Sequence, residues 1–158
     1  MDASETQPSD TPDLPQRKVD SLLQHYGLSH EHPINELIHF FAIPAIMLSL
    51  TGLLFALHPL AALLSIAVSM VYYARLSWPF TVCMLLVWSV LLALVDALQV
   101  QGLLVPVSLL IFVVAWVFQF IGHHLEGKKP SFFEDVQYLL VGPLFVLSKA
   151  FERMGVRW

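Results

Sequence analysis

The sequence predicts an all-α integral membrane protein, a helical bundle of four to five spans with an N-terminal amphipathic helix. Of its 158 residues, 57% are apolar and only 13% are charged, whereas soluble chains carry about 25% charged residues. Between Leu37 and Leu125 the only charged residues are Arg75 and Asp96. Such a stretch cannot cover itself with polar surface, so the lipid bilayer must be its solvent.

The composition divides the chain into a tail and one domain. Residues 1–12 are rich in Ser, Thr, Pro and acidic residues, so we expect a disordered tail, followed by a single helical membrane domain over 13–158. The sequence has no basic patch interleaved with aromatic residues, and we therefore expect no nucleic-acid partner. Its single cysteine, Cys83, can form neither an internal disulfide nor a thiolate zinc site.

Residues 13–26 have the pattern of an amphipathic helix. Apolar residues recur at helical spacing among charged and polar ones, at Val19, Leu22, Leu23 and Tyr26. Gly27 is typical of the residue that ends a helix. We expect this helix either to lie in the membrane interface or to pack on the protein's own polar end.

Four long apolar segments follow, each close to the roughly 20 residues that a membrane span requires. They cover about 34–57, 60–76, 78–100 and 103–125. The connections between them are very short, so neighbouring spans are expected to run antiparallel.

The last apolar segment, 132–151, is ambiguous. Three charged residues shorten it, and Gly142-Pro143 interrupts it. A tilted span, a re-entrant hairpin and an interfacial helix all remain open. Basic residues near the C-terminus favour a cytoplasmic end and hence a re-entrant or interfacial path.

An even number of crossings brings distant histidines to one side of the membrane. After two spans, and again after four, the chain returns to the side on which it began. The Lys and Arg residues between spans all lie on that side, so we predict a cytoplasmic N-terminus, in a bacterial inner membrane or, in a eukaryote, the endoplasmic reticulum. Six of the seven histidines share this side: His25, His30, His32, His39, His123 and His124.

Two of these histidines are candidate metal ligands. His39 and His123 each lie about one turn inside an apolar helix, where an unsatisfied polar group costs several kcal/mol. A shared metal ion would satisfy both imidazoles. Without a thiolate the site does not suit structural zinc, whereas histidines with open coordination positions suit a redox-active Fe2+. The metal site is therefore expected at the cytoplasmic face.

Two amides accompany these histidines. Asn35 and Gln119 each precede one of them by four residues and so share its helical face. They are expected to orient the ligating imidazoles or, alternatively, to form ordinary interhelical hydrogen bonds. For the other polar-end and loop histidines, His25, His58 and His124, a solvated surface position is the simpler interpretation.

Two spaced motifs carry a family resemblance. Tyr26-x3-His30-x4-Asn35-x3-His39-x4-Pro44 is followed by Gln119-x2-Gly122-His123-x2-Glu126-x3-Pro130. Together they resemble the signature of the membrane-bound 2-hydroxy fatty acid dioxygenases of fungi and bacteria, from about residue 25 to residue 155. The resemblance implies a non-haem Fe2+ enzyme of fatty-acid α-oxidation, with His30, His39 and His123 as its motif histidines.

The expected reaction suggests roles for further residues. Glu126 joins Asn35 and Gln119 as a candidate catalytic residue, and Lys129 or its neighbour Lys128 is expected to neutralise the substrate's carboxylate, unless both are ordinary cytoplasmic lysines. His32 is a candidate fourth metal ligand. The expected partners are O2 and a long-chain 2-hydroxy fatty acid that enters from the bilayer.

Three other functions remain open. One is a bis-histidine haem protein with His39 and His123 as axial ligands. Another is a membrane di-iron hydroxylase or desaturase, which would need about eight histidines in HxxxH and HxxHH boxes, whereas Gln119 stands where an HxxHH box would have a histidine. The third is a non-enzymatic transporter or assembly factor, although a transporter would be expected to carry polar residues near mid-bilayer.

Overall fold

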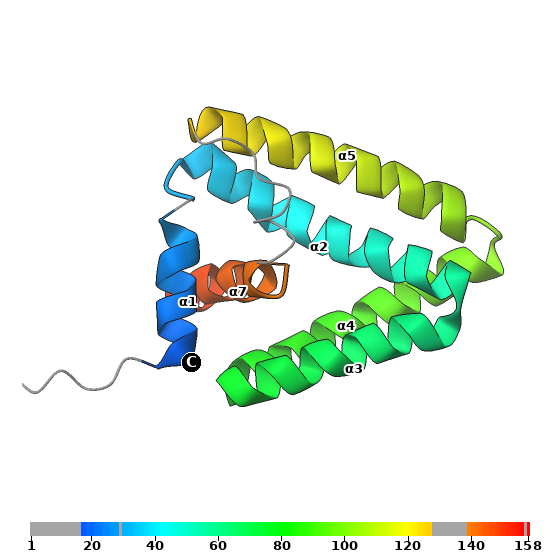
Figure 1. Cartoon of the computed structure of the whole chain (residues 1–158), viewed down its shortest axis with the longest axis horizontal. Coiled ribbons are helices and arrows are strands. Elements are labelled where there is room, and N and C mark those ends of the chain that lie inside the picture. The colour runs from blue at the N-terminus through cyan, green and yellow to red at the C-terminus, as the bar shows by residue number, and fades with distance from the viewer. Residues whose placement is uncertain (1–16, 29, 128–138, 157) are drawn as a thin grey trace, which may run out of the picture.

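The computed structural model describes residues 17–28, 30–127, 139–156 and 158 (Figure 1). This part of the chain contains six helices and no strand, which confirms the all-α prediction. The helices are α1 (Lys18–Gly27), α2 (Pro33–Leu57), α3 (Pro59–Leu76), α4 (Trp78–Val100), α5 (Leu104–Leu125) and α7 (Val141–Met154). The predicted disordered tail and the expected start of the first helix at residue 13 lie outside the described residues.

Four of these helices, α2 to α5, are long and apolar enough to cross a membrane. Their bounds agree with the four predicted spans to within one residue. Proline in the first turn marks the start of α2, α3 and α4, because its fixed φ and missing N–H suit that position. Gly102, with φ of +70°, allows the tight turn between α4 and α5.

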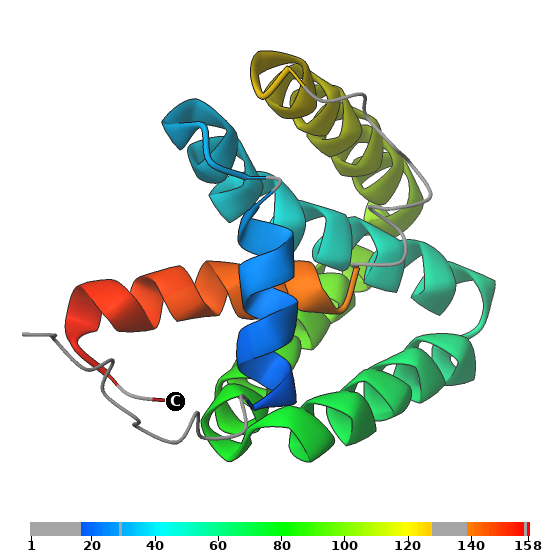
Figure 2. The ribbon, with the colours of Figure 1, turned by 60° about the vertical axis from the view of Figure 1, so that its left-hand side comes forward.

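The four spans form two antiparallel pairs. In Figure 1 the pair α2–α5 and the pair α3–α4 diverge from the turns on the right, and α1 and α7 lie between them on the left. In Figure 1, α1 runs across the direction of the spans and α7 is seen nearly along its own axis, and Figure 2 shows α7 from the side. Helix α2 packs against α5 more extensively than any other two described helices pack on each other. The first and fourth spans are therefore neighbours.

Helices α1 and α7 share one core with the spans. Their buried residues, among them Val19 and Leu23 in α1 and Leu144 and Phe151 in α7, pack in the same cluster as Tyr73, Phe80, Met84 and Trp88. The first helix thus packs on the protein's own end, one of its two expected placements. Helix α7 has 14 residues, fewer than a span requires, so this part of 132–151 is not a tilted span.

Small residues let α2 and α5 approach closely. A Cβ atom added to Gly122 of α5 would clash with Asn35 Oδ1, and one added to Gly52 of α2 would clash with Ser108 Oγ. Small residues at helix interfaces in membranes permit such close contact. This seam brings His39 and His123 to the same end of the bundle.

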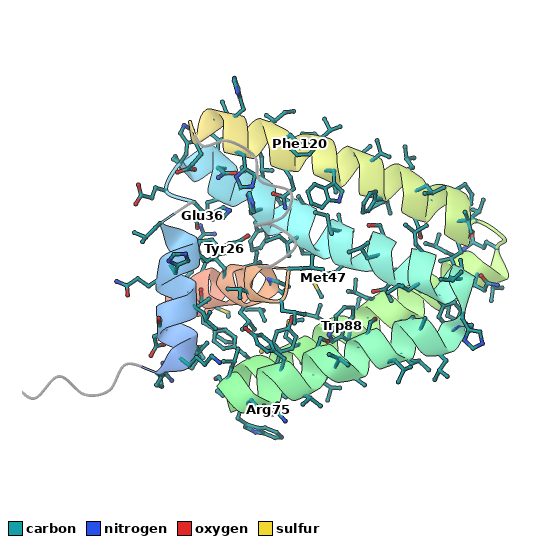
Figure 3. The ribbon with its side chains drawn as sticks, viewed as in Figure 1. Tyr26, Glu36, Met47, Arg75, Trp88 and Phe120 are labelled. Atoms are coloured by element: carbon teal, nitrogen blue, oxygen red, sulfur yellow. The ribbon has the colours of Figure 1, made fainter. Side chains whose placement is uncertain are left out.

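The described cations gather at the end that holds α1 and α7. They are Arg17, Lys18, Arg75, Lys149 and Arg153, and Figure 3 shows Arg75 at the end of α3 on that side. The distribution agrees with the predicted topology, and the identification of this end as cytoplasmic stays a prediction.

Candidate metal centre

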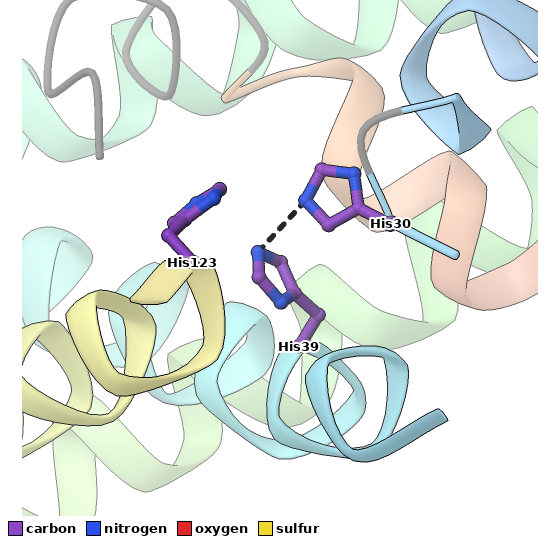
Figure 4. Close-up of side chains that lie close together, drawn as sticks. All are labelled: His30, His39 and His123. Carbon is purple, nitrogen blue, oxygen red and sulfur yellow. Dashed lines mark hydrogen bonds between the residues drawn. The ribbon is translucent and has the colours of Figure 1, made fainter. Parts of the chain in front are cut away.

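Three buried histidines from three segments meet at this end of the bundle (Figure 4). His30 lies between α1 and α2, His39 in the second turn of α2, and His123 in the last turn of α5. Their ring centroids are 4.3 Å (His30–His39), 5.2 Å (His39–His123) and 5.5 Å (His30–His123) apart. One ring nitrogen of each lies within 4.8 Å of those of the other two. The predicted proximity is confirmed, and the metal itself stays a prediction.

Backbone carbonyls fix which nitrogen of two of these rings faces the cluster. His30 Nδ1 lies 2.8 Å from the carbonyl oxygen of Tyr26, and His39 Nδ1 lies 2.9 Å from that of Asn35. A carbonyl oxygen can only accept a hydrogen bond, so each Nδ1 must carry the proton and donate it. In the neutral rings both Nε2 atoms then present a lone pair.

These two Nε2 atoms face each other at 3.0 Å. Two lone pairs at this distance repel, so the contact suits a shared cation, either a proton or a metal ion. Two nitrogen ligands at right angles, each about 2.1 Å from a metal ion, would be about 3.0 Å apart. The donor set therefore fits a metal ion bound by imidazoles.

Aromatic side chains hold the ring of His30 in place. Tyr26 stacks on it, with centroids 4.1 Å apart and an angle of 11° between the rings. Phe145 of α7 lies 5.8 Å from His30 and 5.1 Å from Tyr26, centroid to centroid. Phe145 was missed in the sequence, because its place depends on how α7 folds back onto α1. His30 lies outside any helix, so this stacking, rather than a helical backbone, restricts the orientation of its ring.

Glu126 lies beside this cluster and ties α5 to the start of α2. Its carboxylate accepts hydrogen bonds from the backbone N–H groups of Glu31 (2.8 Å) and His32 (3.0 Å) and from Asn35 Nδ2 (2.9 Å). Partial burial alone would raise the pKa of Glu126, but these hydrogen bonds hold it below its usual value. These hydrogen bonds tie Glu126 to the segment that runs from His30 to His39, and among the described residues Glu126 is absent from the group of converging ligands.

The two amides make different contacts, and their orienting role stays a prediction. Asn35 contacts His39 through its backbone carbonyl, while its side-chain amide donates to Glu126. Gln119 is buried one turn below His123 and lines a cavity of about 30 Å³ that Ile43 and Trp116 also line. Among the described residues, Gln119 Oε1 has no hydrogen-bond partner.

The remaining candidates lie apart from the cluster. His32 begins α2, where its Nδ1 accepts a hydrogen bond from the N–H of Ile34 at 3.2 Å, and it is absent from the group of converging ligands in the described part. His25, His58 and His124 are exposed, in agreement with the surface interpretation. Lys128 and Lys129 lie outside the described residues.

Comparison with known proteins agrees with the motifs. The family model described as "2-hydroxy-palmitic acid dioxygenase Mpo1-like" matches residues 16–154, which include the six described helices and the three clustered histidines. The chain is similar to the 2-hydroxy-palmitic acid dioxygenase MPO1 of Saccharomyces cerevisiae, with 30% identity over 145 residues that cover 85% of this chain and 80% of that protein. No solved structure matches. The chain therefore belongs to the 2-hydroxy-palmitic acid dioxygenase Mpo1-like family.

Proposed function

We propose that this chain is an Fe2+-dependent dioxygenase. It converts a long-chain 2-hydroxy fatty acid and O2 into the fatty acid one carbon shorter, CO2 and water. The observation that carries the proposal is the convergence of three buried imidazoles, two of them with Nε2 turned inward by backbone carbonyls. The name of the Saccharomyces cerevisiae relative supplies the substrate class.

The reaction balances without a further co-substrate. The bond between C1 and C2 breaks, C1 leaves as CO2, and C2 becomes the carboxyl carbon of the product. The substrate gives up four electrons and O2 accepts four, so neither 2-oxoglutarate nor a reductase is required. Bound Fe2+ would offer positions for O2 and for the substrate's 2-hydroxyl and carboxylate, and would act as Lewis acid and electron conduit.

The protein's own residues would hold and shield this site. His30, His39 and His123 would bind the ion, and the carbonyls of Tyr26 and Asn35 keep two of the ligand nitrogens unprotonated. All three imidazoles are at least 94% buried, so the surrounding side chains exclude bulk water, which strengthens electrostatic interactions inside.

The location of the cluster suits an amphiphilic substrate. The histidines lie at the ends of α2 and α5, while both helices continue from there as apolar spans. A fatty acid places its carboxyl head near the headgroups and its tail in the hydrocarbon, so its reacting carbons would lie at the depth of the cluster.

A product assay tests the proposal. Purified protein is incubated with Fe2+ and 2-hydroxypalmitate, and both pentadecanoic acid and O2 consumption are measured. We expect equal amounts of acid formed and O2 consumed, with no dependence on added 2-oxoglutarate. If the protein binds iron yet forms no shortened acid from substrates of several chain lengths, the proposed reaction is wrong.

A further inference from the structure

A second pocket opens between α2 and α7, beside the candidate metal centre. It has a volume of about 300 Å³. Its apolar lining comes from Leu37, Phe40, Phe41, Phe145 and Val146, and its charged rim comes from Glu36, Lys149 and Arg153. Leu37 and Phe41 are 57% and 66% exposed, so the pocket opens on the outer surface of α2, which faces lipid when α2 spans the membrane. Figure 3 shows Glu36 near the α1 end of the bundle.

The described residues of the rim carry more positive than negative charge. Lys149 Nζ lies 3.9 Å from one carboxylate oxygen of Glu36, and Arg153 Nη2 lies 3.6 Å from the other. Both distances exceed the roughly 2.7–2.9 Å of a charged hydrogen bond, so the two cations share one carboxylate loosely. A second carboxylate at the rim would balance the charge.

One side chain separates this pocket from the histidines. Phe145 lines the pocket, and its ring centroid lies 5.8 Å from that of His30. Lys149 Nζ lies 5.3 Å from the same Phe145 ring. A carboxylate bound by Lys149 would therefore lie outside the histidine cluster, on the other side of Phe145 from His30.

We propose that this pocket is the portal where a long-chain fatty acid first binds from the bilayer. Lys149 and Arg153 bind its carboxylate, the phenylalanine-lined wall contacts its chain, and Phe145 separates this position from the reacting one. The inference rests on the proposed function for its substrate. An apolar pocket with a cationic rim at the polar end of a span matches the chemistry of a fatty acid, because the anionic head and apolar tail meet at that depth.

Equilibrium binding of palmitate tests the portal without any turnover. Metal-free protein in phosphatidylcholine nanodiscs is titrated with palmitate and, separately, with hexadecanol, which has the same chain and no charge. Lys149→Gln should weaken palmitate binding roughly threefold, the size typical of a partly exposed charge pair. Glu36→Gln removes the competing carboxylate and should strengthen palmitate binding by a similar factor. Arg75→Gln, a cation at the same end outside the pocket, should change nothing.

Lys149→Gln and Glu36→Gln are expected to change palmitate affinity in opposite directions, and this makes the result decisive. If the ion pairs only held α2 against α7, both variants would weaken binding alike, and this outcome would overturn the portal. Equal affinity of the wild type for palmitate and hexadecanol would also overturn it. Displacement of palmitate by phosphatidylglycerol at equal membrane concentration would assign the rim to a lipid headgroup instead.

Kinetics separate the portal from the reaction itself. In the product assay Lys149→Gln should raise KM for 2-hydroxypalmitate more than it lowers kcat, because the residue acts before the substrate reaches the histidines. Loss of kcat with unchanged KM would contradict the portal. Absence of product in the wild type would remove the proposed reaction, while the palmitate titration would still decide the portal.

Discussion

The two helix pairs of this protein are similar in composition and different in what they bury. The most apolar 18-residue windows of α2 and α5 have mean hydropathies of 2.2 and 2.5, and those of α3 and α4 have 1.5 and 2.3. The first pair buries seven polar residues, Asn35, His39, Ser49, Thr51, Ser108, Gln119 and His123, and the second buries Ser69 and Thr81. Hydropathy alone therefore does not show which pair carries function.

The partners of these polar groups explain the difference. In α3 and α4, Ser69 donates to the carbonyl of Ile66 and Thr81 to that of Ser77, each within or at the start of its own helix. In the first pair, Ser49 and Thr51 also bond within their own helix. Asn35, by contrast, reaches across to Glu126, and His39 faces His30. Polar groups that connect separate segments inside a membrane protein are costly and mark function. The pair α3–α4 instead supplies apolar surface on which α1 and α7 pack.

The largest effect is expected from the histidines of the first pair. His39→Ala and His123→Ala should each lower turnover more than about 100-fold. Even the loss of a residue that only supports a metal ligand typically lowers metal affinity or activity roughly 10–100-fold. The measurement is formation of shortened acid by protein that is still extracted from membranes at the wild-type level. His124→Ala is the matched control, because this neighbour of His123 is exposed. Substantial activity in His39→Ala would contradict the role given to α2.

The seam between α2 and α5 can be tested at both of its ends. Gly122→Ala would push a methyl group against Asn35 Oδ1, so we expect a loss of about 1–3 kcal/mol in stability. Activity should fall at least about tenfold, because small displacements near a catalytic site are costly. Gly52→Ala meets Ser108 Oγ far from the histidines and should lower stability while activity per folded molecule is retained.

Thermal unfolding and turnover are measured on both glycine variants. A matched control is Gly27→Ala, whose added Cβ would lie 3.6 Å from Phe145, an ordinary contact. Equal losses of activity in Gly122→Ala and Gly52→Ala would mean that the seam acts only through overall stability.

A smaller effect is expected from the link between α5 and α2. Glu126→Gln keeps the shape of the side chain but removes the charge that three N–H donors contact. The substitution should lower stability by about 1–2 kcal/mol and should lower turnover without abolishing it. The pKa of Glu126 in the folded protein lies below its usual value. Its charge therefore stabilises the folded state fully at pH values above the usual carboxyl pKa, and this stabilisation is lost as the pH falls through the folded pKa.

Unfolding measured as a function of pH checks the sign of this contribution. The stability difference between wild type and Glu126→Gln should be constant near neutral pH and should shrink in acid. Complete loss of turnover in Glu126→Gln at neutral pH, with the iron still bound, would instead favour the catalytic role first expected for this residue.

The smallest effects are expected in the second pair. Ser69→Ala and Thr81→Val remove hydroxyls that bond only to nearby backbone, so stability should change by less than about 1 kcal/mol and turnover should stay at the wild-type level. A large loss of turnover in either variant would show that α3–α4 takes part in the chemistry, and the contrast between the pairs would fail.

The sequence was sufficient to predict the spans, because each is a long apolar run bounded by proline, glycine or short polar turns. It also predicted that His30, His39 and His123 share one end, since four crossings return the chain to its starting side. It did not show that α2 packs on α5. That pairing depends on close contacts such as Gly122 against Asn35, which hydropathy does not encode.

The roles of two residues depended on contacts between distant segments. Glu126 lies 91 residues from Asn35 in the chain, and only the folded structure shows its carboxylate turned toward the start of α2. Lys149 was predicted only as a sign of topology. Its place beside Glu36 follows from the way α7 crosses α2, which no local pattern in the sequence determines.

Metal analysis of the purified protein tests the central claim most directly. The claim is that α2, α5 and the segment before α2 together hold one iron ion through His30, His39 and His123. We predict about one Fe2+ per chain in the wild type and in His124→Ala, loss of the iron in each of the three alanine variants at the cluster, and an optical spectrum without a Soret band. Iron bound equally well by those three variants, or a Soret band that persists in pure protein, would contradict the account.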